Sequence, residues 1–89
     1  MQCKQDVTIV NQLGLHARAA TKLAQLCQQF SAKIELIQEQ QVADASSVLA
    51  LLMLASSKGK TVQVATDGED AEQALAAVVN LINNGFDEA

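Results

Sequence analysis

The chain has 89 residues, of which 49% are hydrophobic and 18% charged, so we expect one compact domain over residues 1–89. Ten acidic and six basic side chains give a net charge of −4, and the basic residues do not cluster, which argues against a nucleic-acid-binding protein. A single histidine and two separated cysteines provide no set of metal ligands, and we expect neither a metal nor a cofactor.

The N-terminal part of the chain predicts a strand followed by a helix. Residues 6–10 alternate, with Val7 and Ile9 on one face, as in a half-buried strand. From Ala17 onward, apolar residues recur at intervals of three and four, which predicts an amphipathic helix that begins close to His16. The inward positions of this helix are Ala20, Leu23, Ala24 and Cys27.

The middle of the chain predicts a hairpin and a short helix. Alternation over 33–37 and a shorter pattern over 40–44 predict two strands, and the few residues between them indicate a hairpin. The apolar run that follows predicts a helix over 47–54, with Ser47 suited to cap it because a serine hydroxyl accepts a bond from an unpaired backbone N–H.

The C-terminal third predicts one more strand and one more helix. Residues 61–66 alternate clearly, and residues 67–85 begin with acids, continue with helical spacing and end with the C-cap signal Asn84-Gly85. The complete order is strand, helix, strand, strand, helix, strand, helix. Four short strands with intervening helices predict an α+β sandwich in which the helices pack on one face of the sheet.

No segment has the length or composition of a membrane span. The longest apolar run, VLALLMLA, has eight residues, whereas a helix needs roughly 20 to cross a bilayer. The N-terminal residues also lack the basic region and long apolar stretch of a secretory signal. We therefore expect a cytoplasmic protein with no membrane contact.

His16 is the main candidate for chemistry. If it occupies the N-cap of the helix, the backbone N–H groups of Ala17, Arg18 and Ala19 have no partner within the helix. These donors and the helix dipole favour an anion by about 0.3–1 kcal/mol and disfavour a charged imidazolium, so the ring stays neutral and nucleophilic. Arg18 could then hold a phosphoryl group carried on the ring. The alternative is that His16 is merely a polar residue at a helix start.

The stretch LGLHARAA at 13–20, followed by a helix, a strand pair and a serine before a short apolar helix, resembles the HPr family of bacterial phosphocarrier proteins. The resemblance covers nearly the whole chain. It implies an open-faced β-sandwich with a four-stranded antiparallel sheet covered on one face by three helices, in the order βαββαβα. It also implies that His16 receives a phosphoryl group on Nδ1 from enzyme I and passes it to a IIA protein, as a monomeric carrier rather than a turnover enzyme.

The same resemblance assigns roles to further residues. Arg18 and the backbone amides of Ala17, Arg18 and Ala19 would bind the phosphate, and Ser47 falls where the family has a regulatory serine. Within the short helix, exposed residues would dock the partners, while Leu51 and Leu54 would belong to the core. The docking candidates are Val48, Leu49, Leu52 and Met53.

Two segments point to one branch of the family. The stretches DASSVLALLMLASSKGK and LINNGFDEA are more similar to nitrogen-branch carriers than to sugar-branch carriers. This implies a nitrogen-branch enzyme I as donor and a nitrogen-branch IIA protein as acceptor, with a regulatory output. A sugar-branch carrier is one alternative, and a binding module that transfers no phosphoryl group is another.

Ala19 departs from the family pattern, which has proline at this position. Proline in the first turn of a helix restricts the unfolded chain, so alanine gives up about 0.4–1 kcal/mol of stability. It also adds one backbone N–H donor near the phosphate. Because the nucleophile itself is unchanged, we expect phosphoryl transfer to survive.

Overall fold

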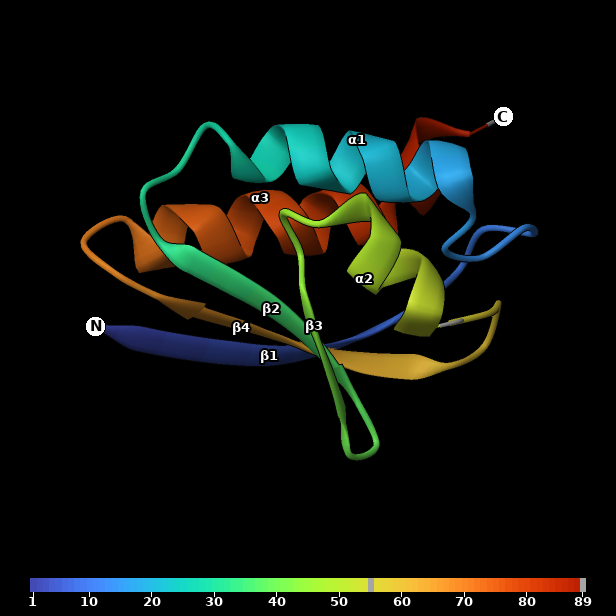
Figure 1. The fold of residues 1–89 in the computed structure, drawn as a ribbon, viewed down its shortest axis with the longest axis horizontal. Helices are drawn as coiled ribbons and strands as arrows, with labels where there is room; N and C mark the ends of the chain where they lie inside the picture. The colour runs from blue at the N-terminus through green and yellow to red at the C-terminus, as the bar shows by residue number, and fades with distance from the viewer. Residues whose placement is uncertain (55, 89) are drawn as a thin grey trace.

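The computed structural model describes residues 1–54 and 56–88. Four strands and three helices follow one another in the expected order, and a short 3-10 turn is added at the C-terminal end (Figure 1). The elements are β1 (Gln2–Thr8), α1 (Ala17–Cys27), β2 (Lys33–Gln38), β3 (Gln41–Asp44), α2 (Val48–Leu54), β4 (Thr61–Asp67), α3 (Ala71–Asn83) and η1 (Gly85–Asp87).

The strands form one antiparallel sheet in the order β1-β4-β2-β3. Strands β2 and β3 make the predicted hairpin, in which Gln38 pairs with Gln41 across a two-residue turn. Glu39 has a φ of 56° in this turn, the left-handed conformation that tight hairpins require. Strands β4 and β2 occupy the centre of the sheet, and β1 lies at one edge.

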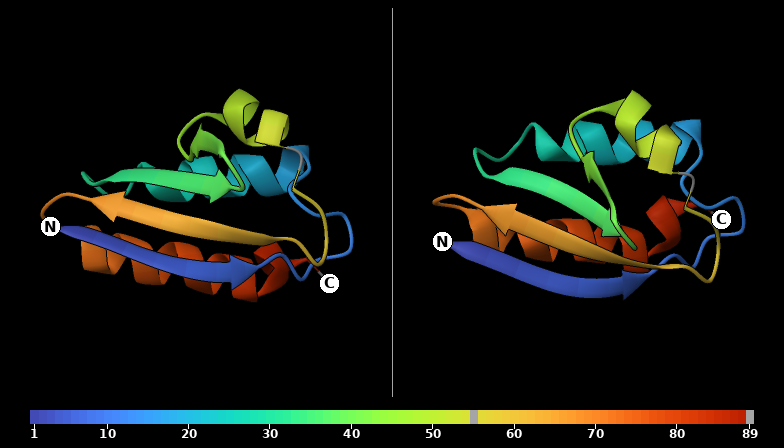
Figure 2. Two further views of the ribbon diagram at one scale, coloured as in Figure 1. Left: turned by 90° about the horizontal axis from the view of Figure 1, so that it is seen from below. Right: turned by 60° about the horizontal axis from the view of Figure 1, so that its bottom comes forward.

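All three helices lie against the same face of the sheet, and the other face is open (Figure 2). Fully buried side chains from both layers meet in one core, in which Leu36, Val62 and Val64 come from the sheet and Leu23, Leu51, Val78 and Ile82 come from the helices. The prediction of a four-stranded antiparallel sheet covered on one face by three helices is therefore confirmed. Within the described residues, no helix is long and apolar enough to span a membrane.

The first strand differs from its prediction over 6–10, because it runs from Gln2 to Thr8. Its N-terminal half is polar, so side-chain alternation could not reveal it, and it exists because its backbone pairs with the end of β4, as in the pair Gln2 and Asp67. Val7 and Ile9 are buried as predicted. The last helix is shorter than the predicted 67–85, because α3 runs from Ala71 to Asn83 and the acids before it precede the first turn. The remaining strand and helix ends lie within about one residue of their predicted positions.

Asp70 joins the loop after α1 to the start of α3. Its carboxylate accepts hydrogen bonds from the backbone N–H groups of Ser31 at 2.9 Å and Ala32 at 2.8 Å. These bonds stabilise the charged form, so the pKa of Asp70 is lowered, chiefly by the Ser31 amide. The ionised carboxylate thus fixes a connection between two parts of the fold that are distant in sequence.

We expect Asp70→Asn to reduce stability at neutral pH and to have a smaller effect in acid. Because the folded-state pKa lies below the unfolded value, the contribution is complete above about pH 4 to 5 and is lost as the pH falls through the folded pKa. Thermal unfolding between pH 2 and 7 would measure this, with the exposed Asp6→Asn as the control. A deficit that stays constant over this range would contradict the assignment to the ionised carboxylate.

Candidate functional site

The loop between β1 and α1 is held in place by the loop that precedes β4. Leu15 donates its backbone N–H to the Ser56 carbonyl at 2.9 Å, and Ile9 donates to the Lys60 carbonyl at 2.9 Å. Gly14 has a φ of +65°, and a Cβ there would lie 2.6 Å from the Ser56 carbonyl oxygen. Glycine is therefore required at this position, both for its conformation and for the close approach of the two loops.

His16 occupies the N-cap position of α1, as the sequence predicts. Its backbone is extended, with φ −84° and ψ −179°, and its carbonyl accepts the first helical bond, from Ala20 N–H at 2.8 Å. Its side chain makes no capping bond. The N–H groups of Ala17, Arg18 and Ala19 therefore form the positive end of the helix beside a ring that is available for other contacts.

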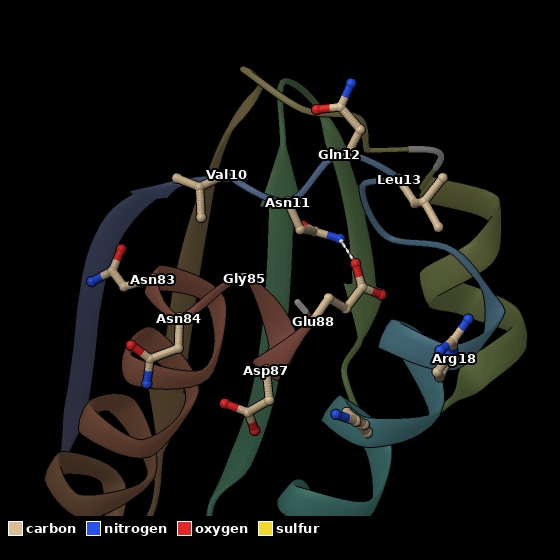
Figure 3. A pocket seen from close by; sticks show the side chains of 11 residues that line it. Val10, Asn11, Gln12, Leu13, Arg18, Asn83, Asn84, Gly85, Asp87 and Glu88 are labelled. Carbon is tan, nitrogen blue, oxygen red and sulfur yellow. Dashed lines mark hydrogen bonds between the residues drawn. The ribbon is translucent and has the colours of Figure 1, made fainter.

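The His16 ring is hydrogen bonded at Nε2 to the Glu88 carboxylate, a contact that no pattern in the sequence predicts. The other carboxylate oxygen of Glu88 accepts a bond from the Asn11 side-chain amide at 3.0 Å (Figure 3). The same Asn11 amide nitrogen donates to the Gly14 carbonyl at 2.8 Å. These bonds lower the pKa of Glu88, the Asn11 bond more than the His16 bond, so the carboxylate is ionised at neutral pH.

Phe86 anchors the segment that carries Glu88. After α3 the chain reverses at Gly85, which has a φ of +63°, and Phe86 is fully buried in the core. Lys22 of α1 donates a bond from Nζ to the Phe86 carbonyl at 2.9 Å. The C-terminal segment consequently lies beside the start of α1 (Figure 1). An aromatic residue directly after a C-cap glycine was the available sequence signal for this return.

An open hollow of about 810 Å³ lies next to this arrangement. Arg18 and Lys22 contribute basic side chains to its lining, Leu13 an exposed apolar side chain, and Glu88 its carboxylate (Figure 3). His16 is not among the lining residues, but its bonded partner Glu88 is. Within residues 1–54 and 56–88, no three His, Cys, Asp or Glu side chains are grouped so that they could hold a metal ion.

The short helix α2 exposes most of the residues predicted to dock partners. Leu51 and Leu54 are buried, as expected, whereas Val48 is half-buried. The three clearly exposed apolar side chains are Leu49 (68%), Leu52 (39%) and Met53 (74%). We call Val48, Leu49, Leu52 and Met53 the α2 patch. The helix that carries it packs against α1, near the N-terminal end of that helix (Figures 1 and 2).

Ser47 caps α2 as predicted. Its Oγ accepts a bond from Ala50 N–H at 3.2 Å, and its carbonyl accepts one from Leu51 N–H at 3.1 Å. The hydroxyl thus has a structural role, worth about 1 kcal/mol in similar caps.

The family model for the PTS HPr component phosphorylation site matches residues 3–84. The chain belongs to the HPr family. It is 51% identical to the phosphocarrier protein NPr of Shewanella violacea over 97% of this chain and 94% of that protein. It is also 51% identical to NPr of Escherichia coli K12, over 99% of both chains. The crystal structure of HPr-C-His from Thermoanaerobacter tengcongensis superposes with a TM-score of 0.93 at 32% identity, covering 98% of each chain.

In this HPr-family protein, we expect Ala19→Pro to raise the free energy of unfolding by about 0.4–1 kcal/mol, because proline restricts the unfolded chain. The first N–H that donates a backbone bond within α1 is that of Ala20. Proline at position 19 therefore breaks no helical hydrogen bond. Chemical denaturation measures the change, and Ala20→Pro is the matched control. That variant removes the bond to His16 and should cost about 3 kcal/mol. A loss of stability in Ala19→Pro would show that the fully buried site cannot accommodate the ring.

Proposed function

We propose that this protein is a cytoplasmic phosphocarrier in which His16 takes a phosphoryl group from enzyme I on Nδ1 and gives it to a IIA protein. The observation that supports this most directly is the bond between Glu88 and Nε2 of a histidine at a helix N-terminus. With Nε2 engaged by an acceptor, Nδ1 is the nitrogen whose lone pair can act as the nucleophile. The membership of the HPr family supports the same chemistry.

The phosphoryl group would be bound by the start of α1. Free backbone N–H groups at a helix N-terminus bind anions, and Ala17, Arg18 and Ala19 supply them here. The exposed Arg18 guanidinium adds a fork of donors that matches phosphoryl oxygens. The carboxylate of Glu88 would not compete for these phosphate-binding groups, because it bonds to the ring at Nε2.

The nitrogen branch is the favoured setting. The relatives from Shewanella violacea and Escherichia coli K12, each 51% identical over nearly the full chain, are both named NPr. We assign the donor as a nitrogen-branch enzyme I and the acceptor as a nitrogen-branch IIA protein. Ser47 would be a point of regulation only through a phosphate at the start of α2, where it would add negative charge beside the α2 patch.

The decisive experiment is incubation with phosphoenolpyruvate and the enzyme I of either branch. We expect an acid-labile, base-stable phosphoryl group on the protein, formed faster with the nitrogen-branch enzyme and absent from His16→Ala. Intact-protein mass spectrometry at alkaline pH measures it. A correctly folded parent that accepts no phosphoryl group from either enzyme would instead favour a binding module that uses the α2 patch alone.

The α2 patch is the surface on which we expect enzyme I and the IIA protein to dock. Leucine and methionine side chains adapt to different partners, which suits a carrier that must contact two proteins in turn. Val10 (44% exposed) and Leu13 (64% exposed) add apolar surface in the loop before His16. Exposed apolar side chains thus lie both in the loop before His16 and on α2, which packs against α1.

We expect Met53→Asp to slow phosphorylation by enzyme I about tenfold or more, since a charge at the centre of a docking contact opposes desolvation. Its melting temperature should stay close to that of the parent, because the side chain is 74% exposed. Gln73→Asp, an equal charge change on the exposed side of α3, should affect neither property. Leu51→Ala, at a fully buried position of the same helix, should instead lose about 2–5 kcal/mol of stability. Transfer at the parental rate by Met53→Asp would remove Met53 from the docking surface.

A further inference from the structure

The contact between Glu88 and His16 indicates which ring nitrogen carries a proton. A carboxylate that is ionised can only accept hydrogen bonds, so the Nε2 atom bonded to it must carry the proton. Asn11 supports this assignment, because its amide nitrogen donates to the other oxygen of the same carboxylate. The side chains of His16 and Glu88 are 23% and 17% exposed, so water competes only partly for the contact.

We propose that Glu88 is a positioning residue that keeps the proton on Nε2 of His16 throughout the transfer cycle, both in the free ring and in the phosphohistidine. This inference rests on the proposed function, since it concerns how the same histidine accepts and releases the phosphoryl group. Glu88 touches the ring nitrogen that does not react.

The proton on Nε2 allows both transfer steps to balance without any proton movement. On loading, the Nδ1 lone pair forms the N–P bond while the bond between phosphorus and the donor breaks, and its electron pair leaves with the donor. The ring, now substituted on both nitrogens, is cationic and lies against the negative Glu88. On release, the acceptor's lone pair attacks phosphorus, the P–Nδ1 electron pair returns to the ring, and a neutral imidazole leaves. Without the Nε2 proton the leaving group would be an imidazolate, which is far less stable.

Other charged side chains lie in the neighbouring loops and helix, but among the described residues Glu88 is the one bonded to the ring. Arg18 and Lys22 project from α1, Lys58 from the loop before β4, and Asp87 from the C-terminal segment. Lys22 bonds to the Phe86 carbonyl and Lys58 to the Gln12 side chain. Arg18 acts on Glu88 only at longer range, through charge. The pH dependence of the phosphohistidine should therefore respond mainly to Glu88.

The first test uses the unphosphorylated protein and two variants. Long-range proton–nitrogen correlation spectra of the imidazole at pH 8 should show the tautomer with hydrogen on Nε2 in the parent. Glu88→Gln keeps an acceptor oxygen and should retain this tautomer, whereas Glu88→Ala should give a mixture. A parent that carries its proton on Nδ1, or a mixture in the parent, would overturn the proposal. This measurement needs no phosphoryl donor, so it can fail or succeed independently of the proposed function.

The second test follows the phosphorylated protein between pH 5 and 9. Removing the carboxylate should shift the midpoint of phosphohistidine hydrolysis about one unit toward acid, because the ring cation then loses its proton more readily. At pH 8, both variants should hydrolyse about tenfold more slowly than the parent, with little difference at pH 5. Glu39→Gln, an equal charge change at the exposed β2–β3 turn, should follow the parent. Variant and parent profiles that coincide would overturn the proposal, as would an equal slowing at every pH.

Discussion

Asn11 joins the two irregular segments that build the site, and the geometry around His16 depends on this side chain. Its amide nitrogen donates one hydrogen to the Gly14 carbonyl, in the turn before His16, and the other to the Glu88 carboxylate. Backbone bonds hold the first segment against the loop before β4, and the buried Phe86 anchors the second, so Asn11 adds the direct link between the two. Asn11 is 7% exposed, which limits competition from water and makes these bonds more effective.

Most of the fold follows from side-chain periodicity. Alternation located β2 and β4, and spacing of three and four located α1 and α3, because in these elements one face packs in the core while the other contacts solvent. The first half of β1 could not be predicted in this way, since it is exposed and is held by backbone pairing with β4. The exposure of Leu49 and Met53 was predictable, because α2 has more apolar residues than one buried face can use.

The site was only partly predictable from sequence. The position of His16 at the start of α1 follows from local pattern, and so does the set of free backbone N–H groups beside it. The contact with Glu88 joins residues 72 positions apart, and no local pattern encodes it. It depends on where Phe86 is buried, which in turn depends on the packing of α3 against the sheet. The exposure of Leu13 could not be predicted either, because a loop has no periodicity that separates buried from exposed side chains.

In the proposed mechanism the two nitrogens of the His16 ring meet opposite charges, which suits a carrier better than a uniformly basic site would. The helix N-terminus and Arg18 would favour the anionic phosphoryl group, while Glu88 would favour the cationic ring that carries it. A basic site without the carboxylate would hold the phosphoryl group but oppose the charge on the ring, and so favour the unprotonated phosphohistidine, which releases the group slowly. A carboxylate without the basic groups would repel the incoming phosphoryl group. With both present, binding of the phosphate and activation of its leaving group act on different atoms, so either can be strengthened without loss of the other.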